Sequence, residues 1–178
     1  MSQKALFLDR DGIINIDHGY VYQKENFEFM RDIFALCKQA QTLNYRIFVI
    51  TNQAGIARGF YSEDDFHQLT FWMVEQFTQN GIVIDKVYHC PHHPTKGESV
   101  YTQACDCRKP APGMILQAKK EFDVDLSHSV FIGDKVSDMQ AADNAGIPNR
   151  LFLAGQYGDE ESIEATRICA LKDAISYL

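Results

Sequence analysis

Four short polar segments hold residue types that could carry out chemistry on a phosphate. They are Asp9-Arg10-Asp11-Gly12, Thr51-Asn52, Arg108-Lys109-Pro110 and Gly133-Asp134-Lys135. Carboxylates brought together from distant parts of a chain suit a hard, oxygen-seeking cation such as Mg²⁺, and nearby lysine and threonine side chains suit a phosphate. These segments therefore favour phosphoryl transfer, provided that the fold brings them to one place.

A second group of residues could hold a metal of a different kind. It consists of the segments Cys90-Pro91-His92-His93-Pro94 and Cys105-Asp106-Cys107. Three thiolates and one imidazole form the ligand set of a closed tetrahedral zinc site. The spacing alone does not choose among His89, His92 and His93, and buried thiols without a metal remain the alternative interpretation.

The pattern of apolar residues indicates the elements that must position these groups. Short apolar runs predict strands at 5–8, 46–50, 83–88, 129–132, 151–153 and 167–170, and helical spacing predicts helices at 33–44, 62–81, 114–122 and 138–145 and after Leu171. Residues 13–30 are expected to form a long ordered loop, and 89–113 contain too much Cys, His and Pro for a regular element. Asp159-Glu160-Glu161 with Glu164 is typical of a first helical turn.

This alternation of strands and helices predicts an α/β fold with one doubly wound parallel sheet and helices on both faces. Ligands of such sheets bind beyond the carboxyl ends of the strands, where three of the four polar segments follow predicted strands. We find no linker, repeat or inserted cap domain, so we expect residues 1–178 to form one domain with a metal-binding loop at about 89–110.

The polar segments, in this order, resemble the haloacid dehalogenase superfamily of aspartate-nucleophile phosphatases. The resemblance spans nearly the whole chain, and it also includes Asp138 after the last segment. It implies that Asp9 attacks phosphorus and that Asp11 is the general acid and base. It further implies that Thr51 and Lys109 stabilise the phosphoryl group. Mg²⁺ would be bound by Asp9, Asp134 and the backbone carbonyl of Asp11.

One position departs from the superfamily pattern. A threonine usually follows the Asp-Gly pair, whereas this chain has Ile13. Because that threonine usually supports the turn and the second aspartate, its absence puts the rate in doubt by one hydrogen bond of about 0.5–1.5 kcal/mol. The type of reaction is not affected, and we predict an active enzyme.

The cysteine-rich loop narrows the resemblance within the superfamily. Its sequence is similar to the zinc loop of the heptose 1,7-bisphosphate phosphatases and the related histidinol phosphatases, which places a structural Zn²⁺ on Cys90, His92, Cys105 and Cys107. Residues 15–21 and 51–59 are also similar to the heptose enzymes. The resemblance implies removal of the C7 phosphate from D-glycero-D-manno-heptose 1,7-bisphosphate. The residues expected to bind this sugar bisphosphate are Asp17, His18, Gly19, Tyr20, Thr51, Asn52, Gln53, Ala54, Arg108, Lys109 and Lys135.

Two alternatives accompany this prediction. A histidinol-phosphate phosphatase would share the fold, the aspartates and the zinc loop. A zinc-stabilised binding module without catalysis would explain the Cys/His segments but not Asp9, Asp11, Lys109 and Asp134.

Composition excludes several other classes. The chain has 178 residues, 46% of them hydrophobic, which is enough for a globular core. A net charge of -7 without a basic run argues against binding nucleic acid. We see no signal peptide and no run of membrane-spanning length, so we expect a cytoplasmic protein with no membrane partner. The sequence shows no apolar stripe that would need a protein partner, so we expect a monomer. Of the five cysteines, Cys37 and Cys169 are expected in the core.

Overall fold

Six parallel strands form a single sheet in the order β3-β2-β1-β4-β5-β6. The computed structural model describes residues 2–97, 100–155 and 164–178. The strands are β1 (Ala5–Leu8), β2 (Arg46–Asn52), β3 (Lys86–Cys90), β4 (Val130–Gly133), β5 (Asn149–Leu153) and β6 (Thr166–Ile168). Because β1 pairs in parallel with both β2 and β4, the polar segments at the ends of these three strands meet at one edge of the sheet.

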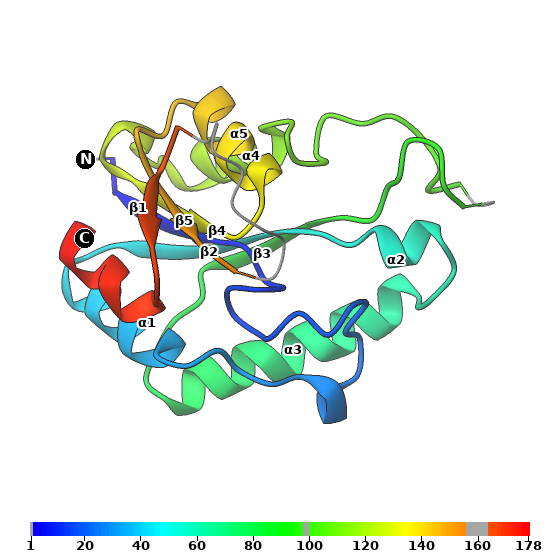
Figure 1. Cartoon of the computed structure of the whole chain (residues 1–178), viewed down its shortest axis with the longest axis horizontal. Helices are drawn as coiled ribbons and strands as arrows, with labels where there is room; N and C mark the ends of the chain where they lie inside the picture. The colour runs from blue at the N-terminus through cyan, green and yellow to red at the C-terminus, as the bar shows by residue number, and fades with distance from the viewer. Residues whose placement is uncertain (1, 98–99, 156–163) are drawn as a thin grey trace.

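Helices cover both faces of the sheet, as the sequence predicts (Figure 1). One face packs against α1 (Ile33–Thr42), α3 (Glu63–Gln79) and the C-terminal 3-10 helix η3 (Leu171–Tyr177), and the other face packs against α4 (Gly113–Phe122) and α5 (Val136–Ala145). Along β1, Leu6 and Leu8 belong to the first apolar core and Phe7 to the second. Strand alternation therefore divides the core into two layers.

Local sequence signals explain where α3 begins and ends. The Ser62 side chain accepts a hydrogen bond from the backbone N–H of Asp65, and the Asp65 carboxylate accepts one from the backbone N–H of Ser62, which forms a capping box. Gly81 adopts a positive φ of 72° just after the helix. Four residues of α3 are buried on one face, namely Phe66, Leu69, Met73 and Phe77.

The structure corrects several predicted bounds. The third strand is Lys86–Cys90 rather than 83–88, because the Asp85 carboxylate accepts a hydrogen bond from the backbone N–H of Ile47 and only the residues after it pair with β2. The irregular segment therefore starts after Cys90. The pattern also missed the short helix α2 (Ala54–Ala57) and two 3-10 turns, η1 (Lys24–Asn26) and η2 (Leu126–His128).

Smaller differences concern the C-terminal part of the chain. The helix after Leu171 is present as a 3-10 helix, and Cys169 is exposed rather than in the core, whereas Cys37 is buried. The acidic run Asp159–Glu161 lies outside the described residues, and Glu164 is not helical. Within the described ranges, no helix is long and apolar enough to cross a membrane.

Candidate functional site

Three buried carboxylates meet beyond the ends of β1 and β4. Asp9 follows β1, Asp134 follows β4, and Asp138 lies in the first turn of α5. One carboxylate oxygen of each lies within 4.8 Å of the others, and all three residues are at most 5% exposed. Asp138 was part of the family resemblance, but it was not among the expected site residues. Its backbone contacts hold the loop in place, because its Oδ2 accepts hydrogen bonds from the N–H groups of Asp134 and Lys135 at 3.1 and 3.0 Å.

The Lys109 ammonium compensates part of this negative charge. It contacts Asp9 Oδ1 at 2.8 Å and Asp138 Oδ1 at 2.6 Å, and it donates a hydrogen bond to the carbonyl of Ile50 at 2.9 Å. Asn52 anchors the backbone of Lys109, since its side-chain amide accepts from the N–H and donates to the carbonyl. Lys109 is therefore joined to β2 through both its side chain and its backbone.

The three carboxylates carry more negative charge than the Lys109 ammonium can neutralise. Burial and the neighbouring Asp138 raise the pKa of Asp9 to about 6, against the opposing effect of Lys109. Burial and the charge of Asp9 raise the pKa of Asp134 to about 8. Burial lowers the pKa of Lys109, but Asp138 and Asp9 outweigh it and raise that pKa above its usual value. The arrangement as a whole stabilises a further cation.

The space beside Asp134 fits a metal ion. Oδ1 of Asp134 is buried and has no hydrogen-bond partner among the described residues. Gly12, whose φ is 93°, passes so close that a Cβ at this position would overlap the Asp134 carboxylate. Oxygen ligands with this geometry are the donor set that Mg²⁺ prefers.

Asp11 is held by three side chains, of which only Gln53 was an expected site residue. Its Oδ1 accepts hydrogen bonds from Arg10 at 2.8 Å and Asn15 at 3.1 Å, and its Oδ2 accepts one from Gln53 at 3.1 Å. Arg10 is itself buried and donates to the carbonyl of Val21 at 2.6 Å. Arg10 therefore ties the Asp11 carboxylate to the loop over residues 13–30.

Gln53 connects Asp11 to the second polar segment. Its side-chain N–H group donates both to Asp11 and to the hydroxyl of Thr51, the latter at 2.8 Å, while its carbonyl oxygen accepts from the hydroxyl of Tyr61. The sequence placed Gln53 among the substrate-binding residues and missed Tyr61. A tyrosine just before the predicted start of α3 carries no signal of this contact, which joins residues on either side of α2 (Ala54–Ala57).

A pocket of about 550 Å³ opens beside Asp11, Gln53 and Lys109. The loop over residues 13–30, the segment after β2 and the cysteine-rich loop all line it. Nine of the eleven residues expected to bind substrate face it, namely Asp17, Gly19, Tyr20, Asn52, Gln53, Ala54, Arg108, Lys109 and Lys135. Thr51 is buried beneath the pocket, and His18 lies in a neighbouring hollow, where it is 3.5 Å from Glu28.

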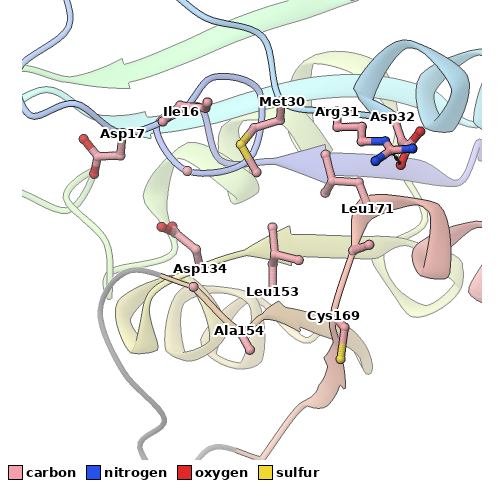
Figure 2. Close-up of a pocket in the computed structure, with 13 residues that line it drawn as sticks. Ile16, Asp17, Met30, Arg31, Asp32, Asp134, Leu153, Ala154, Cys169 and Leu171 are labelled. Atoms are coloured by element: carbon pink, nitrogen blue, oxygen red, sulfur yellow. Dashed lines mark ion pairs between the residues drawn. The ribbon is translucent and has the colours of Figure 1, made fainter.

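A second, mostly apolar pocket of about 340 Å³ lies beside Asp134 (Figure 2). Asp17 and Asp134 are at one end of the view, and Cys169 and Leu171 are at the other. Asp17 lines both pockets, and its carboxylate lies 3.4 Å from the ammonium of Lys135. Nearby carboxylates, Asp9 first, raise the pKa of Lys135 in spite of burial. The sequence did not predict this second pocket.

The cysteine-rich loop brings together the four expected zinc ligands. Sγ of Cys90 lies 3.5 Å from that of Cys105 and 3.0 Å from that of Cys107, and the two latter sulfurs are 3.4 Å apart. Nδ1 of His92 completes the group at 3.6 Å from Cys90 and 3.4 Å from Cys107. A tetrahedral metal with bonds of about 2.3 Å to sulfur would separate sulfur ligands by roughly 3.8 Å, so the ligand atoms, now 3.0–3.6 Å apart, would move outward by a few tenths of an ångström and by about 0.8 Å for the Cys90–Cys107 pair.

The other candidate histidines have different partners. Nε2 of His89 lies 2.9 Å from Glu63, and Nδ1 of His93 accepts hydrogen bonds from the N–H groups of Thr95 and Lys96. The fold therefore resolves the choice among three histidines that the spacing left open.

Comparison with known proteins gives the family. The "HAD-hyrolase-like" family profile matches residues 106–171. The chain is 54% identical to the D-glycero-alpha-D-manno-heptose-1,7-bisphosphate 7-phosphatase of Campylobacter jejuni, over 86% of this chain and 84% of the relative. The chain belongs to the heptose-1,7-bisphosphate 7-phosphatase family. It is thus a phosphatase of the haloacid dehalogenase superfamily, as the motifs predict.

Two further members of this family are similar to the chain. The D-glycero-beta-D-manno-heptose-1,7-bisphosphate 7-phosphatase of Vibrio cholerae is 45% identical over 86% of this chain and 82% of the relative. The crystal structure of the D,D-heptose 1,7-bisphosphate phosphatase from B. bronchiseptica, complexed with magnesium and phosphate, matches with a TM-score of 0.81 at 29% identity. This match covers 98% of this chain and 97% of that chain. The family therefore includes relatives named for either anomer.

Proposed function

We propose that this chain removes the C7 phosphate from D-glycero-D-manno-heptose 1,7-bisphosphate through an aspartyl phosphate on Asp9. The observation that carries the proposal is the buried cluster of Asp9, Asp134 and Lys109 beside a pocket that Asp11 and Lys109 line, in a chain whose relatives are named for this reaction. The anomeric configuration is left to experiment, because relatives of both kinds are similar to the chain.

Asp9 is the proposed nucleophile. A carboxylate that approaches a phosphate is repelled by about 4 kcal/mol per unit of phosphate charge at 4 Å and an effective dielectric of 20. Lys109, which already contacts Asp9, offsets part of this repulsion. Asp9, Asp134 and the backbone carbonyl of Asp11 would hold Mg²⁺, which when bound would neutralise phosphate charge. The Mg²⁺ complex of a structural relative supports this assignment.

Asp11 is the proposed general acid and base. It lies two residues after the nucleophile and faces the substrate pocket. Its contacts with Arg10, Asn15 and Gln53 hold the carboxylate in one orientation. Asp11 would protonate the sugar oxygen as it leaves phosphorus and would then accept a proton from the water that hydrolyses the aspartyl phosphate.

Thr51 and Lys109 are the proposed donors to the phosphoryl oxygens. The hydroxyl oxygen of Thr51 accepts a hydrogen bond from Gln53, so its own proton is directed away from that amide and is available to a phosphoryl oxygen. Fixed donors of this kind stabilise the transition state because they need no reorganisation during the reaction.

Arg108 and Lys135 give the pocket the charge that a second phosphate requires. Arg108 donates a hydrogen bond from its guanidinium to the backbone carbonyl of His92 at 3.2 Å, so the cysteine-rich loop positions it. We assign Arg108 and Lys135 to the distal phosphate and the loop from Asp17 to Tyr20 to the sugar hydroxyls. His18 is a weaker candidate for this role, because its ring lies in the neighbouring hollow.

We assign a structural Zn²⁺ to Cys90, His92, Cys105 and Cys107. Four protein ligands leave no open coordination position, so this ion would take no part in the chemistry. Its effect would be positional, because Arg108 and Lys109 follow Cys107 directly in the chain.

The substrate is tested by measuring kcat/KM for the heptose bisphosphate and for histidinol phosphate with the same preparation. We expect a clear preference for the heptose bisphosphate, since Arg108 and Lys135 would have no second phosphate to bind in histidinol phosphate. A preference for histidinol phosphate would refute the proposed substrate while leaving the phosphatase chemistry intact.

A further inference from the structure

Three metal-ligating side chains meet at a place distinct from the catalytic cluster and from the cysteine cluster. Glu63 and His67 lie one turn apart on α3, and His89 is the fourth residue of β3. One ligand atom of each lies within 4.8 Å of the others. His89 precedes the zinc ligand Cys90, but its ring points to α3 instead of to the thiols.

The surrounding contacts already fix two of these three side chains. Nε2 of His89 is 2.9 Å from Oε1 of Glu63, and the His89 ring packs on Phe66 with the ring centroids 4.3 Å apart. The hydroxyl of Tyr101 donates a hydrogen bond to Oε2 of Glu63 at 2.8 Å. A hydrogen bond to the second oxygen of a ligating carboxylate is the usual way in which an outer shell orients a metal ligand.

His67 supplies the third ligand from the exposed side of α3. It follows Glu63 by four residues, and this spacing puts the two side chains on the same face of the helix. Its ring is perpendicular to that of His89, at 88°, with the centroids 5.3 Å apart. Because His67 is exposed, its side chain can change rotamer at little cost in packing.

We propose that Glu63, His67 and His89 form an accessory site for a divalent transition metal of the zinc class. Two imidazoles and one carboxylate are a common ligand set for Zn²⁺, and water would fill the remaining position because His67 faces solvent. Mg²⁺ is disfavoured here, since it prefers oxygen ligands.

The geometry needs only a small adjustment to accept the ion. Bonds of about 2.0–2.2 Å to nitrogen and oxygen separate tetrahedral ligand atoms by roughly 3.4 Å. The hydrogen-bonded pair of His89 and Glu63 would therefore open by about 0.5 Å, and His67 would move inward. The ion would join α3 to the end of β3 and, through Tyr101, to the cysteine-rich loop.

The test is the zinc content of the protein as purified, with its cysteine cluster intact, after equilibration with micromolar Zn²⁺. We expect wild-type protein to bind one more zinc per chain than the His67→Ala variant. His128→Ala is the matched control, because His128 is also exposed and is 2.8 Å from a carboxylate, that of Asp125, but belongs to no three-ligand group of the described residues. This control should bind as much zinc as wild type.

Co²⁺ identifies the ligands of the accessory site when it is added to protein whose cysteine cluster already holds zinc. Binding at the accessory site should give weak ligand-field absorption without a thiolate charge-transfer band, and His67→Ala should abolish that absorption. Equal zinc content in wild type and His67→Ala, with no Co²⁺ spectrum that depends on His67, would overturn the proposal. Neither measurement uses phosphatase activity, so the result is independent of the proposed substrate.

Discussion

Lys109 is a buried cation between two buried carboxylates, and both contacts are shorter than 3 Å. A buried ion pair contributes little net stability, but removal of one partner leaves the other charge uncompensated. In this chain two carboxylates, those of Asp9 and Asp138, would lose their partner at once. Lys109 is therefore expected to be important for stability as well as for phosphoryl transfer.

The variant Lys109→Met tests whether Lys109 serves both stability and phosphoryl transfer. We expect it to abolish activity and to lower the free energy of unfolding by about 3–5 kcal/mol, the range for breaking a buried pair. Adding Asp138→Asn should restore part of that stability, because one of the two uncompensated buried charges is then removed. Denaturant unfolding of the single and double variants measures the effect, and Lys119→Met, at an exposed position of α4, should be nearly neutral. A double variant less stable than Lys109→Met would contradict the argument.

Ile13 stands where the superfamily pattern has threonine, and the structure shows what surrounds it. The side chain is fully buried in the core layer that contains α1 and α3. Asp11 already accepts hydrogen bonds from three other side chains. We therefore expect these donors to give Asp11 the support that threonine usually supplies, and the rate to be unaffected by Ile13.

Ile13→Thr should therefore leave kcat nearly unchanged and lower the free energy of unfolding by about 2 kcal/mol, since it buries a hydroxyl and removes a methylene from the core. Ile14→Thr is the matched control, because Ile14 is equally buried and adjacent in sequence. Steady-state kinetics and urea unfolding provide the two measurements. A several-fold increase in kcat specific to Ile13→Thr would show that the missing hydrogen bond limits the reaction.

At the residue scale, polar side chains at or just after the ends of strands could be recognised from the sequence. The side chains that hold those residues in place could not. Asp9, Asp11, Thr51 and Asp134 are recognisable because a polar residue follows a buried apolar run. Arg10, Asn15 and Tyr61 act through contacts that exist only after loops have folded together, and no local pattern marks them. Nothing in the spacing of the histidines could exclude His89, because its partner Glu63 is 26 residues away.

The cysteine-rich loop is the element with the most direct effect on the site. Arg108 and Lys109, which directly follow Cys107 in this loop, line the pocket above the carboxylates. An error of about 1 Å in the placement of such groups can reduce a rate roughly 100-fold. Loss of the proposed zinc should therefore impair catalysis without removing any catalytic group.

Cys107→Ser is expected to lose zinc and to reduce kcat/KM by roughly 100-fold, with Mg²⁺ still in excess. Cys169→Ser, at an exposed cysteine outside the loop, should retain both zinc and activity. Metal analysis after dialysis and phosphate release from the same samples are the measurements. Full activity in zinc-free Cys107→Ser protein would refute the positional role.

The Glu121 carboxylate of α4, which accepts hydrogen bonds from β3, is expected to make the free energy of unfolding depend on pH. Hydrogen bonds from Lys86, Tyr88 and Gln117 lower the pKa of Glu121 to about 2. Between this value and the ordinary pKa of glutamate, the unfolded chain binds more protons than the folded one, so stability rises with pH across that window. The stabilisation by Glu121 is complete above the ordinary pKa and is lost as the pH falls toward 2.

The comparison of wild type with Glu121→Gln tests that prediction. The difference in Tm should be largest near neutral pH and should shrink below about pH 4.5, the upper end of the window. A difference that is constant across that range would show that the Glu121 carboxylate does not contribute through its charge.

The order and bounds of the elements were partly predictable. Apolar runs identified all six strands, because buried parallel strands are continuously apolar. The third strand was misplaced by two to three residues, since Ile82 and Ile84 are apolar core residues before the strand begins. The short helix α2 escaped detection because four residues are too few to show a helical period.

At the scale of the whole molecule, the parallel sheet explains why segments from distant parts of the chain form one site. All six strands point the same way, so the ends of β1, β2 and β4 lie at one edge (Figure 1). The net charge of -7 describes the whole chain, whereas the pocket lining itself contains three cationic side chains, those of Arg108, Lys109 and Lys135. An acidic protein can thus bind a doubly phosphorylated sugar.

The most direct test of the central claim is phosphate release from the heptose 1,7-bisphosphate anomers in the presence of Mg²⁺, with the product identified by phosphorus NMR. We predict that wild type releases the C7 phosphate and leaves a heptose 1-phosphate, and that folded Asp9→Asn protein releases none. Release of the anomeric phosphate, or turnover by Asp9→Asn at the wild-type rate, would contradict the proposed function.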